Sequence, residues 1–537
     1  MATRDFRGVV GSLAVTLLTA CVAGSVGDER DVIEQTSAPL LGRLKRECSD
    51  TFDSIYVPPG PAKPYNRGDI VRCARGRRIG TDEITKALSS RKFVGIEALK
   101  AVKLFRITYR TERLAGQPDF ATALVALPAK KQQASTPVAA GEDDDEEQDN
   151  LKSGKRAPLV VFAHGTAPYG TACASSKLDP LQCSQTLDGD TELAFIAALA
   201  TLGHPVIAPD YAGYVQGSKA AGYLLAEDEA HSVLDAARSM DKLRTKSVDK
   251  VVLVGHSQGG HAVLSAQALA SKYGMAGQLA GTAAMAPFWA PLRLLPLIVA
   301  GPPLDTNPFA QAFAIEYFYT GAEVRDGPGQ GELLFNPDKR NLLRSYVSTC
   351  DFSSTFCTFI NLPPDGFGLA SEFFDGPFFE AVSACGFDRS LCNASALAQK
   401  WEQRFVSDRP AVDRNGARIV LWHGAADPII PAPFAKCAIK KITRDLGLNN
   451  NANVDADDAD VEKIANSPTF SFCGDASADH DQILSHNAAW VSQWIAARAV
   501  GDPEPTAGGC LTARQFKDAV AATGQMFTCP NPPGNKD

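Results

Sequence analysis

The sequence lacks several patterns that would place it in common functional classes. It has no C-x-x-C pair and no cluster among its 8 histidines, so it predicts no metal site and no cofactor. The net charge is −8 and no basic stripe is present, which argues against a nucleic-acid partner. Beyond the N-terminus, no segment approaches the roughly 18 uninterrupted apolar residues of a membrane-spanning helix. With 537 residues and 45% hydrophobic content, the chain is expected to be globular.

The N-terminal segment is typical of an export signal. Arg4 and Arg7 precede an uncharged stretch at 8–20, which has an apolar part of signal-peptide length. A small residue directly before Cys21 resembles the bacterial lipoprotein signal, in which the cysteine becomes the first mature residue and receives lipid. This resemblance predicts an exported chain that a lipid at Cys21 anchors to the membrane, at the bacterial outer membrane or cell surface. The alternative is a plain secretory signal with an incidental cysteine and a secreted product.

The other cysteines are close neighbours along the chain. Of the 13 cysteines an even twelve remain without Cys21, and an exported protein is expected to hold them in disulfides. Each bridge would stabilise the fold by roughly 2–4 kcal/mol. Sequence does not determine the connectivity. Neighbour pairing is our hypothesis, with bridges 48/73, 173/183, 350/357, 385/392, 437/473 and 510/529.

A short motif carries the strongest indication of chemistry. Residues 255–259 read G-H-S-Q-G, after a β-branched apolar run at 251–254 and before an Ala/Leu-rich segment at 261–270. The run predicts a buried strand and the segment a helix. A G-x-S-x-G at a strand-to-helix turn is the nucleophile elbow of an α/β-hydrolase, in which glycines avoid collisions with neighbouring backbone. We therefore expect Ser257 to be a nucleophile.

Strands alternate with helices along most of the chain. This alternation predicts an α/β fold, with a mainly parallel sheet flanked by helices and right-handed crossovers. An antiparallel pair at 103–110 and 120–127 is expected to precede it. Ligands of such sheets bind beyond the carboxyl ends of the strands. The core strands are predicted at 158–163, 205–208, 251–254, 280–286 and 418–422, and the first helices at 191–202 and 227–243.

Composition divides the chain into six parts. Residues 130–156 contain the run E-D-D-D-E-E and almost no large apolar residues, which predicts a disordered surface loop. The segment between the strands at 280–286 and 418–422 is rich in aromatics and too long for a connector, which predicts a cap over the sheet edge. The predicted parts are a signal peptide at 1–20, a tether and N-terminal extension at 21–100, a first core part at 101–287, the cap at 288–416, a second core part at 417–500 and a cysteine-closed tail at 501–537.

A serine hydroxyl needs a base, and the chain order of this fold is serine, acid, histidine. Asp427 directly follows the late strand at 418–422, where the acid is expected to orient the base. A turn-capping role is the alternative for Asp427. Only His480 and His486 follow this acid. We favour His480, because it lies on a strand-to-helix loop, whereas His486 would already lie in the helix.

The oxyanion hole needs two preorganised backbone donors. One is expected to be the amide of Gln258, the residue after the nucleophile. The other is expected from the loop after the strand at 158–163, with Thr166 as the donor.

Together, these landmarks resemble the secretory-lipase-like branch of the α/β-hydrolase superfamily. The resemblance spans roughly residues 100–500 and is poor in the cap. It implies hydrolysis of carboxylic esters, often of lipids, through an acyl-enzyme. We accordingly expect an acyl-ester substrate and a monomeric enzyme. The matching motifs are V-F-A-H-G-T at 161–166, A-P-D-Y at 208–211, G-H-S-Q-G-G at 255–260, H-G-A-A-D at 423–427 and D-H at 479–480.

Two other functions stay open on the same scaffold. A serine peptidase or an acyltransferase would use the same residues on another substrate, and fold alone does not separate these activities. A non-catalytic surface-binding lipoprotein would need no triad at all. The presence of Ser257, Asp427 and His480 in the expected chain order favours an enzyme over this last interpretation.

Overall fold

The fold is known from a computed structural model, in which described residues belong to one compact unit, Arg43–Asp537. The segment around Cys21 and the acidic run at 130–156 lie outside the described residues, so the predictions made for them stay predictions. The structure describes residues 44–59, 65–129, 157–167, 170, 173–178, 189–217, 220–289, 294–300, 308–348, 368–448, 467–502, 510–527 and 529.

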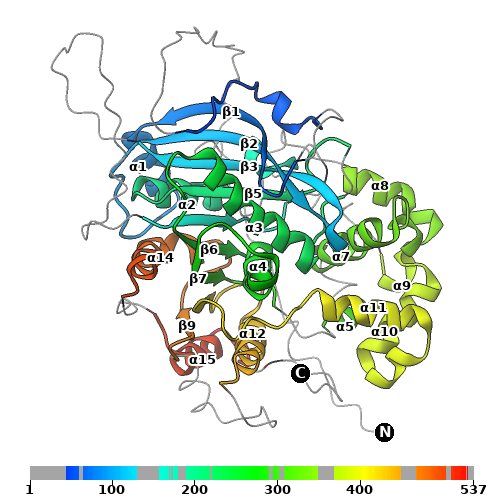
Figure 1. Ribbon diagram of the computed structural model, residues 1–537. Helices are drawn as coiled ribbons and strands as arrows, with labels where there is room; N and C mark the ends of the chain where they lie inside the picture. Colours follow the sequence, from blue (N-terminus) through cyan, green and yellow to red (C-terminus); the bar gives the residue numbers. More distant parts are fainter. Residues whose placement is uncertain are drawn as a thin grey trace, which may run out of the picture. The chain divides into compact units, whose positions relative to one another are not determined.

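Within these residues, nine strands form one sheet in the order β1-β2-β3-β5-β4-β6-β7-β8-β9 (Figure 1). Strands β1, β2 and β3 pair antiparallel with their neighbours, and β3 also meets β5 antiparallel. From β5 to β9 all pairs are parallel. The strands are β1 (Ile70–Ile79), β2 (Val102–Glu112), β3 (Pro118–Pro128), β4 (Leu159–Ala163), β5 (Val206–Ala212), β6 (Lys250–His256), β7 (Gln278–Met285), β8 (Ile419–Gly424) and β9 (Phe470–Asp475).

Helices connect the parallel strands. Within the described chain, no helix has both the length and the apolar character needed to cross a membrane. The helices are α1 (Thr81–Ser90), α2 (Gly189–Thr201), α3 (Ala226–Leu243), α4 (Gln258–Tyr273), α5 (Leu294–Ala300), α7 (Pro308–Asp326), α8 (Arg340–Ser348), α9 (Ala370–Phe373), α10 (Gly376–Phe387), α11 (Ala396–Ser407), α12 (Ala432–Asp445), α14 (Gln482–Val500) and α15 (Ala513–Ala522).

The sheet is buried on both faces. Successive strand residues point to opposite faces. Val161 of β4 belongs to the buried cluster that includes residues of α3, α4, α12 and α15, while Val160 and Phe162 belong to the cluster that includes α1, α2 and α14. Both faces of β4 and β6 are therefore apolar, which explains why these strands read as continuous apolar runs rather than as alternating ones. The predicted α/β fold class is confirmed.

The antiparallel start of the sheet is larger than predicted. The hairpin of β2 and β3 is confirmed, but β1 was missed. Its ten residues include Arg72, Arg75, Arg77 and Arg78, so the segment shows neither an apolar run nor a clean alternation. The strand is stable because it pairs with β2 at the edge of the sheet, where arginines can reach solvent.

A helical segment, α5 to α11, lies between β7 and β8; we call it the inserted helices. Phe318 and Trp401 are fully buried at the centre of its aromatic core, with their ring centroids 5.0 Å apart. Figure 1 shows α8, α9, α10 and α11 grouped together, in light green to yellow. Most of the aromatic residues that made this segment stand out in the sequence pack against one another in this core.

Two of the predicted disulfides are confirmed. They are Cys48–Cys73 and Cys385–Cys392, which close short stretches of chain. Cys173 is disulfide-bonded. Its predicted partner at 183 and the predicted pair at 350 and 357 lie outside the described residues, so these pairings stay predictions.

The predicted bridges 437/473 and 510/529 are wrong. The structure pairs Cys437 with Cys529 and Cys473 with Cys510. The sheet is the physical reason, because Cys473 packs with α14 on one face while α12, which carries Cys437, packs on the other. Helix α15 packs on the same face of the sheet as α12 and is followed by Cys529. Cys529 therefore lies on the side of the sheet that carries Cys437, and Cys473 pairs with Cys510 instead.

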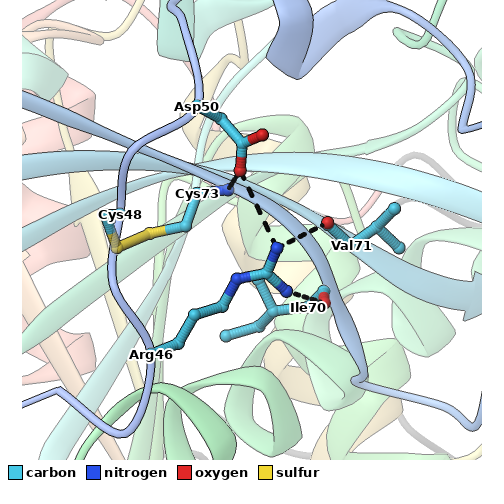
Figure 2. Close-up of a disulfide and its surroundings, with 6 residues drawn as sticks. All are labelled: Arg46, Cys48, Asp50, Ile70, Val71 and Cys73. Carbon is cyan, nitrogen blue, oxygen red and sulfur yellow. Dashed lines mark hydrogen bonds and ion pairs between the residues drawn. A yellow bond between two sulfur atoms is a disulfide. The ribbon is translucent and has the colours of Figure 1, made fainter.

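The segment before β1 closes one edge of the sheet. Figure 2 shows Cys48 bonded to Cys73 of β1, with the Asp50 carboxylate accepting a hydrogen bond of 2.7 Å from the Cys73 amide. The Arg46 guanidinium donates to the carbonyls of Ile70 and Val71 at 2.6 and 2.9 Å. An exposed strand edge invites pairing with other chains, and this segment covers part of it.

Candidate active site

Ser257 lies on a strained turn between β6 and α4. Its backbone has φ 56° and ψ −118°, in a region that residues with a side chain rarely adopt. Its amide donates to the Met285 carbonyl of β7 at 2.9 Å, and its own carbonyl accepts from the His261 amide at 3.3 Å. These bonds hold the serine at the carboxyl end of β6, directly before the first amides of α4.

Two glycines permit this turn. A Cβ on Gly259 would lie 1.8 Å from the Ala163 carbonyl oxygen, at the end of β4. A Cβ on Gly255 would lie 2.0 Å from the Gly259 carbonyl oxygen. The start of α4 therefore packs directly on the backbone of β4 and of the loop that follows it, which is the geometry that the G-x-S-x-G pattern predicts.

Asp427 and His480 meet at the same edge of the sheet. Asp427 lies on the loop after β8, His480 lies between β9 and α14, and their Oδ2 and Nδ1 atoms are 2.7 Å apart. The two loops are held together by the Ala426 amide, which donates to the Ala478 carbonyl at 3.2 Å. A Cβ on Gly424 would lie 2.1 Å from that same carbonyl oxygen, so glycine permits the approach.

The electrostatics of the pair suit an orienting acid. Burial disfavours the Asp427 carboxylate, but the attraction of His480, its hydrogen bond and the Ile430 amide outweigh burial and hold the pKa of Asp427 below its ordinary value. Asp427 is therefore ionised at neutral pH. Its charge favours the tautomer in which His480 carries the proton on Nδ1. In that tautomer the Nε2 atom carries a lone pair that can accept a proton.

The structure places His486 elsewhere. It lies in α14, where its Nδ1 is 3.2 Å from Oδ2 of Asp475. Its side chain is 26% exposed, whereas that of His480 is 4% exposed. Of the two histidines that the chain order allows, His480 is the one that Asp427 contacts.

The loop after β4 carries the candidate oxyanion donor Thr166. The Tyr211 hydroxyl donates to the His164 carbonyl at 2.7 Å, and the Gly165 amide donates to Oε1 of Glu192 at 2.7 Å. Thr166 itself is buried, with its hydroxyl 3.2 Å from the Tyr223 hydroxyl. Since Gly259 packs on this loop, Thr166 and Gln258 lie on adjoining segments, as two oxyanion donors must.

Comparison with known proteins gives a family match over part of the chain. Residues 179–290 match the family model described as secretory lipase, a stretch that includes Ser257 but neither Asp427 nor His480. No curated protein sequence matches the chain.

Solved structures share the architecture over most of the chain. Lipase A of Candida antarctica in its closed state is 18% identical, with a TM-score of 0.54, over 89% of this chain and 97% of that one. The rice cell wall degrading esterase LipA of Xanthomonas oryzae, in a ligand-bound form, is 17% identical, with a TM-score of 0.51, over 86% and 99% of the two chains. The chain has the α/β-hydrolase fold.

Sequence reasoning missed a buried carboxylate close to the candidate residues. Oε1 of Glu192, on α2, accepts from the Gly165 amide and lies 2.8 Å from Nδ1 of His256. The other ring nitrogen of His256 lies 2.9 Å from the His480 carbonyl oxygen. Glu192 and His256 thus connect the candidate oxyanion loop to the backbone of the candidate base.

A second missed carboxylate lies close to the residue that follows Ser257. Glu229, in the first turn of α3, accepts from the side chain of Gln258 at 2.8 Å and lies 2.7 Å from Nδ1 of His261. Both histidines were visible in the sequence, but His256 precedes Ser257 and His261 lies within the helix that follows it, so neither was a candidate for the base. Nothing in the pattern of α2 or α3 marks either glutamate as buried.

Among the described residues, no group of three or more His, Cys, Asp or Glu side chains could hold a metal ion.

Proposed function

We propose that the chain is a serine carboxylic ester hydrolase of the lipase or esterase type, with Ser257 as nucleophile, His480 as base and Asp427 as the acid that orients it. The amides of Thr166 and Gln258 form the oxyanion hole. The observation that carries the proposal is the 2.7 Å contact of Asp427 with His480, at the sheet edge where the strained Ser257 turn lies. The match to secretory lipases across the elbow supports it.

In the first half of the reaction, Nε2 of His480 takes the proton of the Ser257 hydroxyl as Oγ attacks the ester carbonyl carbon. The carbonyl electron pair moves onto oxygen, and the two backbone amides stabilise that negative charge. When the carbonyl re-forms, the alkoxy group leaves and accepts the proton from His480. An acyl group remains on Ser257.

In the second half, water replaces the alcohol. His480 takes a proton from the water, whose oxygen attacks the acyl carbon. Collapse of the second tetrahedral intermediate releases the carboxylic acid and returns the proton to Ser257. Asp427 stays ionised throughout and stabilises the imidazolium that forms in each half.

The setting of the enzyme belongs to the proposal. We infer that the inserted helices act as a cap, since Asp408 at the end of α11 contacts His261 of α4 through a 2.6 Å hydrogen bond. The disulfides favour an exported protein, because such bonds persist in oxidising compartments. A lipid at Cys21, an acyl-ester substrate drawn from lipids and a monomeric state complete the proposal.

Replacing either member of the nucleophile–base pair tests the mechanism. Ser257→Ala and His480→Ala are expected to lower the hydrolysis of p-nitrophenyl butyrate by at least about 10⁴-fold, because the serine supplies the attacking oxygen and the histidine moves its proton. Ser257→Ala is also expected to abolish covalent labelling by a fluorophosphonate.

Matched controls exist for both variants. Ser271→Ala changes an exposed serine near the end of the same helix, and His486→Ala changes the alternative histidine. Both are expected to keep activity within about 3-fold. Retained activity in Ser257→Ala would exclude the proposed nucleophile, and a wild-type protein that neither turns over esters nor labels would point to a binding protein.

A further inference from the structure

Glu229 is a buried carboxyl group that the reaction described above does not use. Its residue is 1% exposed, at the start of α3, where the positive end of the helix favours a negative charge. Three donors converge on it: Oε1 accepts from Gln258 and from the Leu224 amide, and Oε2 faces Nδ1 of His261. A carboxyl group buried this deeply is costly unless its bonds are all made, so its placement is tightly determined.

The hydrogen bond between Glu229 and Gln258 holds the residue that carries one of the two proposed oxyanion donors. Nε2 of Gln258 donates to Glu229 at 2.8 Å, which anchors the side chain of the residue directly after Ser257. The backbone amide of Gln258 is the proposed oxyanion donor. Holding its side chain limits rotation of the peptide unit at the strained turn.

The hydrogen bond between Glu229 and Leu224 holds a segment that packs against Thr166, which carries the other proposed donor. The Leu224 amide donates to Glu229 at 2.9 Å, and Leu224 has a φ of 54°, an unusual conformation that this bond helps to maintain. The adjoining residue Tyr223 contacts the hydroxyl of Thr166 at 3.2 Å through its own hydroxyl. The residue that carries the second proposed donor therefore packs against a segment that Glu229 fixes.

The third bond reaches the inserted helices. Nδ1 of His261 is 2.7 Å from Glu229, and its Nε2 donates to the Asp408 carbonyl at 2.6 Å. The Asp408 carboxylate in turn accepts from the Tyr317 hydroxyl at 2.7 Å and pairs with Arg325, both on α7. Burial disfavours the His261 imidazolium, but Glu229 and the Asp408 carbonyl outweigh burial and raise the pKa of His261.

We propose that Glu229 is a positioning residue that couples the inserted helices to both sides of the oxyanion hole. Packing of α7 and α11 is transmitted through Asp408 and His261 to Glu229, and from Glu229 to the residues that carry the two backbone donors. The inference rests on the proposed ester hydrolase function. It assigns to Glu229 no contact with the substrate, so its loss affects the stabilisation of the transition state rather than the binding of the ester.

Two replacements of Glu229 separate positioning from simple structural support. Glu229→Leu removes all three bonds. Glu229→Gln keeps them, because its amide oxygen accepts from Gln258 and Leu224 while its amino group donates to Nδ1 of neutral His261. We expect Glu229→Leu to lower kcat for p-nitrophenyl butyrate by about 10- to 100-fold and to change KM by less than about 3-fold. This loss in kcat is smaller than the roughly 10²–10³-fold loss that follows removal of a whole oxyanion donor, because both backbone amides remain. Glu229→Gln is expected to stay within about 5-fold of the wild type.

The assay counts active sites, so that misfolding is not mistaken for a slower reaction. Each kcat is divided by the concentration of sites that a fluorophosphonate labels at completion. Glu227→Gln is the matched control on the same helix, since Glu227 binds only the Ala115 amide at the surface and is expected to leave kcat unchanged. Should Glu229→Leu fail to fold, Gln258→Ala provides a milder test, because it deletes one bond and leaves the carboxylate in place.

The outcomes are distinct. A titrated kcat of Glu229→Leu, or of Gln258→Ala if the leucine variant does not fold, that equals the wild-type value overturns the inference. A rise in KM at constant kcat also overturns it, because that result places Glu229 in substrate binding. A wild-type protein that neither labels nor hydrolyses esters overturns the proposed function itself, before any variant of Glu229 is compared.

Discussion

Glu316 is a buried carboxyl group on α7, 2% exposed. Among the described residues it forms no ion pair, and its Oε2 has no hydrogen-bond donor. Burial raises the pKa of Glu316 well above its ordinary value of 4.5. The side chain is therefore neutral in the folded protein over a range of pH in which an unfolded chain would ionise it.

This difference makes stability depend on pH with a definite sign. Below pH 4.5 both states are protonated, and Glu316 adds no penalty. As the pH rises, only the unfolded state ionises, so stability falls by about 1.4 kcal/mol per pH unit until the folded group also titrates. Glu316→Gln removes this dependence.

We expect Glu316→Gln to match the wild type in thermal stability near pH 4 and to exceed it increasingly at pH 6 and pH 8. Unfolding temperatures measured at the three pH values test this. Glu380→Gln, at an exposed position of α10, serves as the control and should show no such trend. A gap between Glu316→Gln and the wild type that is the same at every pH would contradict the pKa argument.

Residue roles differed in how far sequence could predict them. Ser257, Asp427 and His480 occupy loops that the strand pattern locates, so their chain order pointed to a common site. Glu192 and Glu229 lie within helices, where a glutamate is usually on the surface. Their burial depends on which side of each helix meets the sheet and the elbow, and that contact involves residues distant in sequence.

At the level of secondary-structure elements, the junction of β4, β6 and α4 depends on glycine. The Cβ of an alanine at 259 would lie 1.8 Å from the Ala163 carbonyl oxygen and 2.8 Å from that of His164. Both obstacles are backbone atoms, so relief requires α4 to move away from β4. The strained Ser257 turn would move with it.

Gly259→Ala is expected to cost about 3 kcal/mol or more of folding free energy, because backbone rather than a side chain must shift. Denaturant unfolding of purified protein measures the loss, and a failure to accumulate soluble protein would agree with it. Gly376→Ala is the control, since nothing lies within 4 Å of a Cβ there, at the start of α10. Unchanged stability of Gly259→Ala would show that the junction is looser than described.

Core strands such as β4 and β6 could be predicted because strands that are buried on both faces consist of consecutive apolar residues. Strand β1 was not, because an edge strand tolerates Arg72 and Arg75 among its apolar residues. Helix α15 was not predicted either, although its position on the α12 face determines where Cys529 lies.

At the scale of the whole described unit, the two ends of the sheet are closed in the same way. At β1 the isolated bridge Ser49–Ala74 lies beside the disulfide Cys48–Cys73. At β9 the bridge Gly474–Leu511 lies beside the disulfide Cys473–Cys510, with hydrogen bonds of 2.8 and 2.9 Å between the two backbones. Each covalent bond thus holds a short segment over an edge strand, which limits pairing with other chains.

The double variant Cys473→Ser and Cys510→Ser is expected to lose about 4 kcal/mol of unfolding free energy, because this disulfide joins residues 37 apart. The corresponding variant of Cys385 and Cys392, which are 7 apart, is expected to lose about 2 kcal/mol. Denaturant unfolding without reductant compares the two double variants. Peptide mapping of the intact protein checks the pairing, and recovery of a 437–473 peptide pair would contradict the structure.

The chain positions of most core strands, of the turn at Ser257 and of the loops that carry Asp427 and His480 follow from local patterns, since burial and turn chemistry constrain neighbouring residues directly. The partners of Cys437 and Cys473, and the carboxylates behind Ser257, depend on which face of the sheet each helix covers. No spacing along the chain encodes that choice. Long-range packing makes it, by placing α12 and α15 on one side of the sheet and α14 on the other.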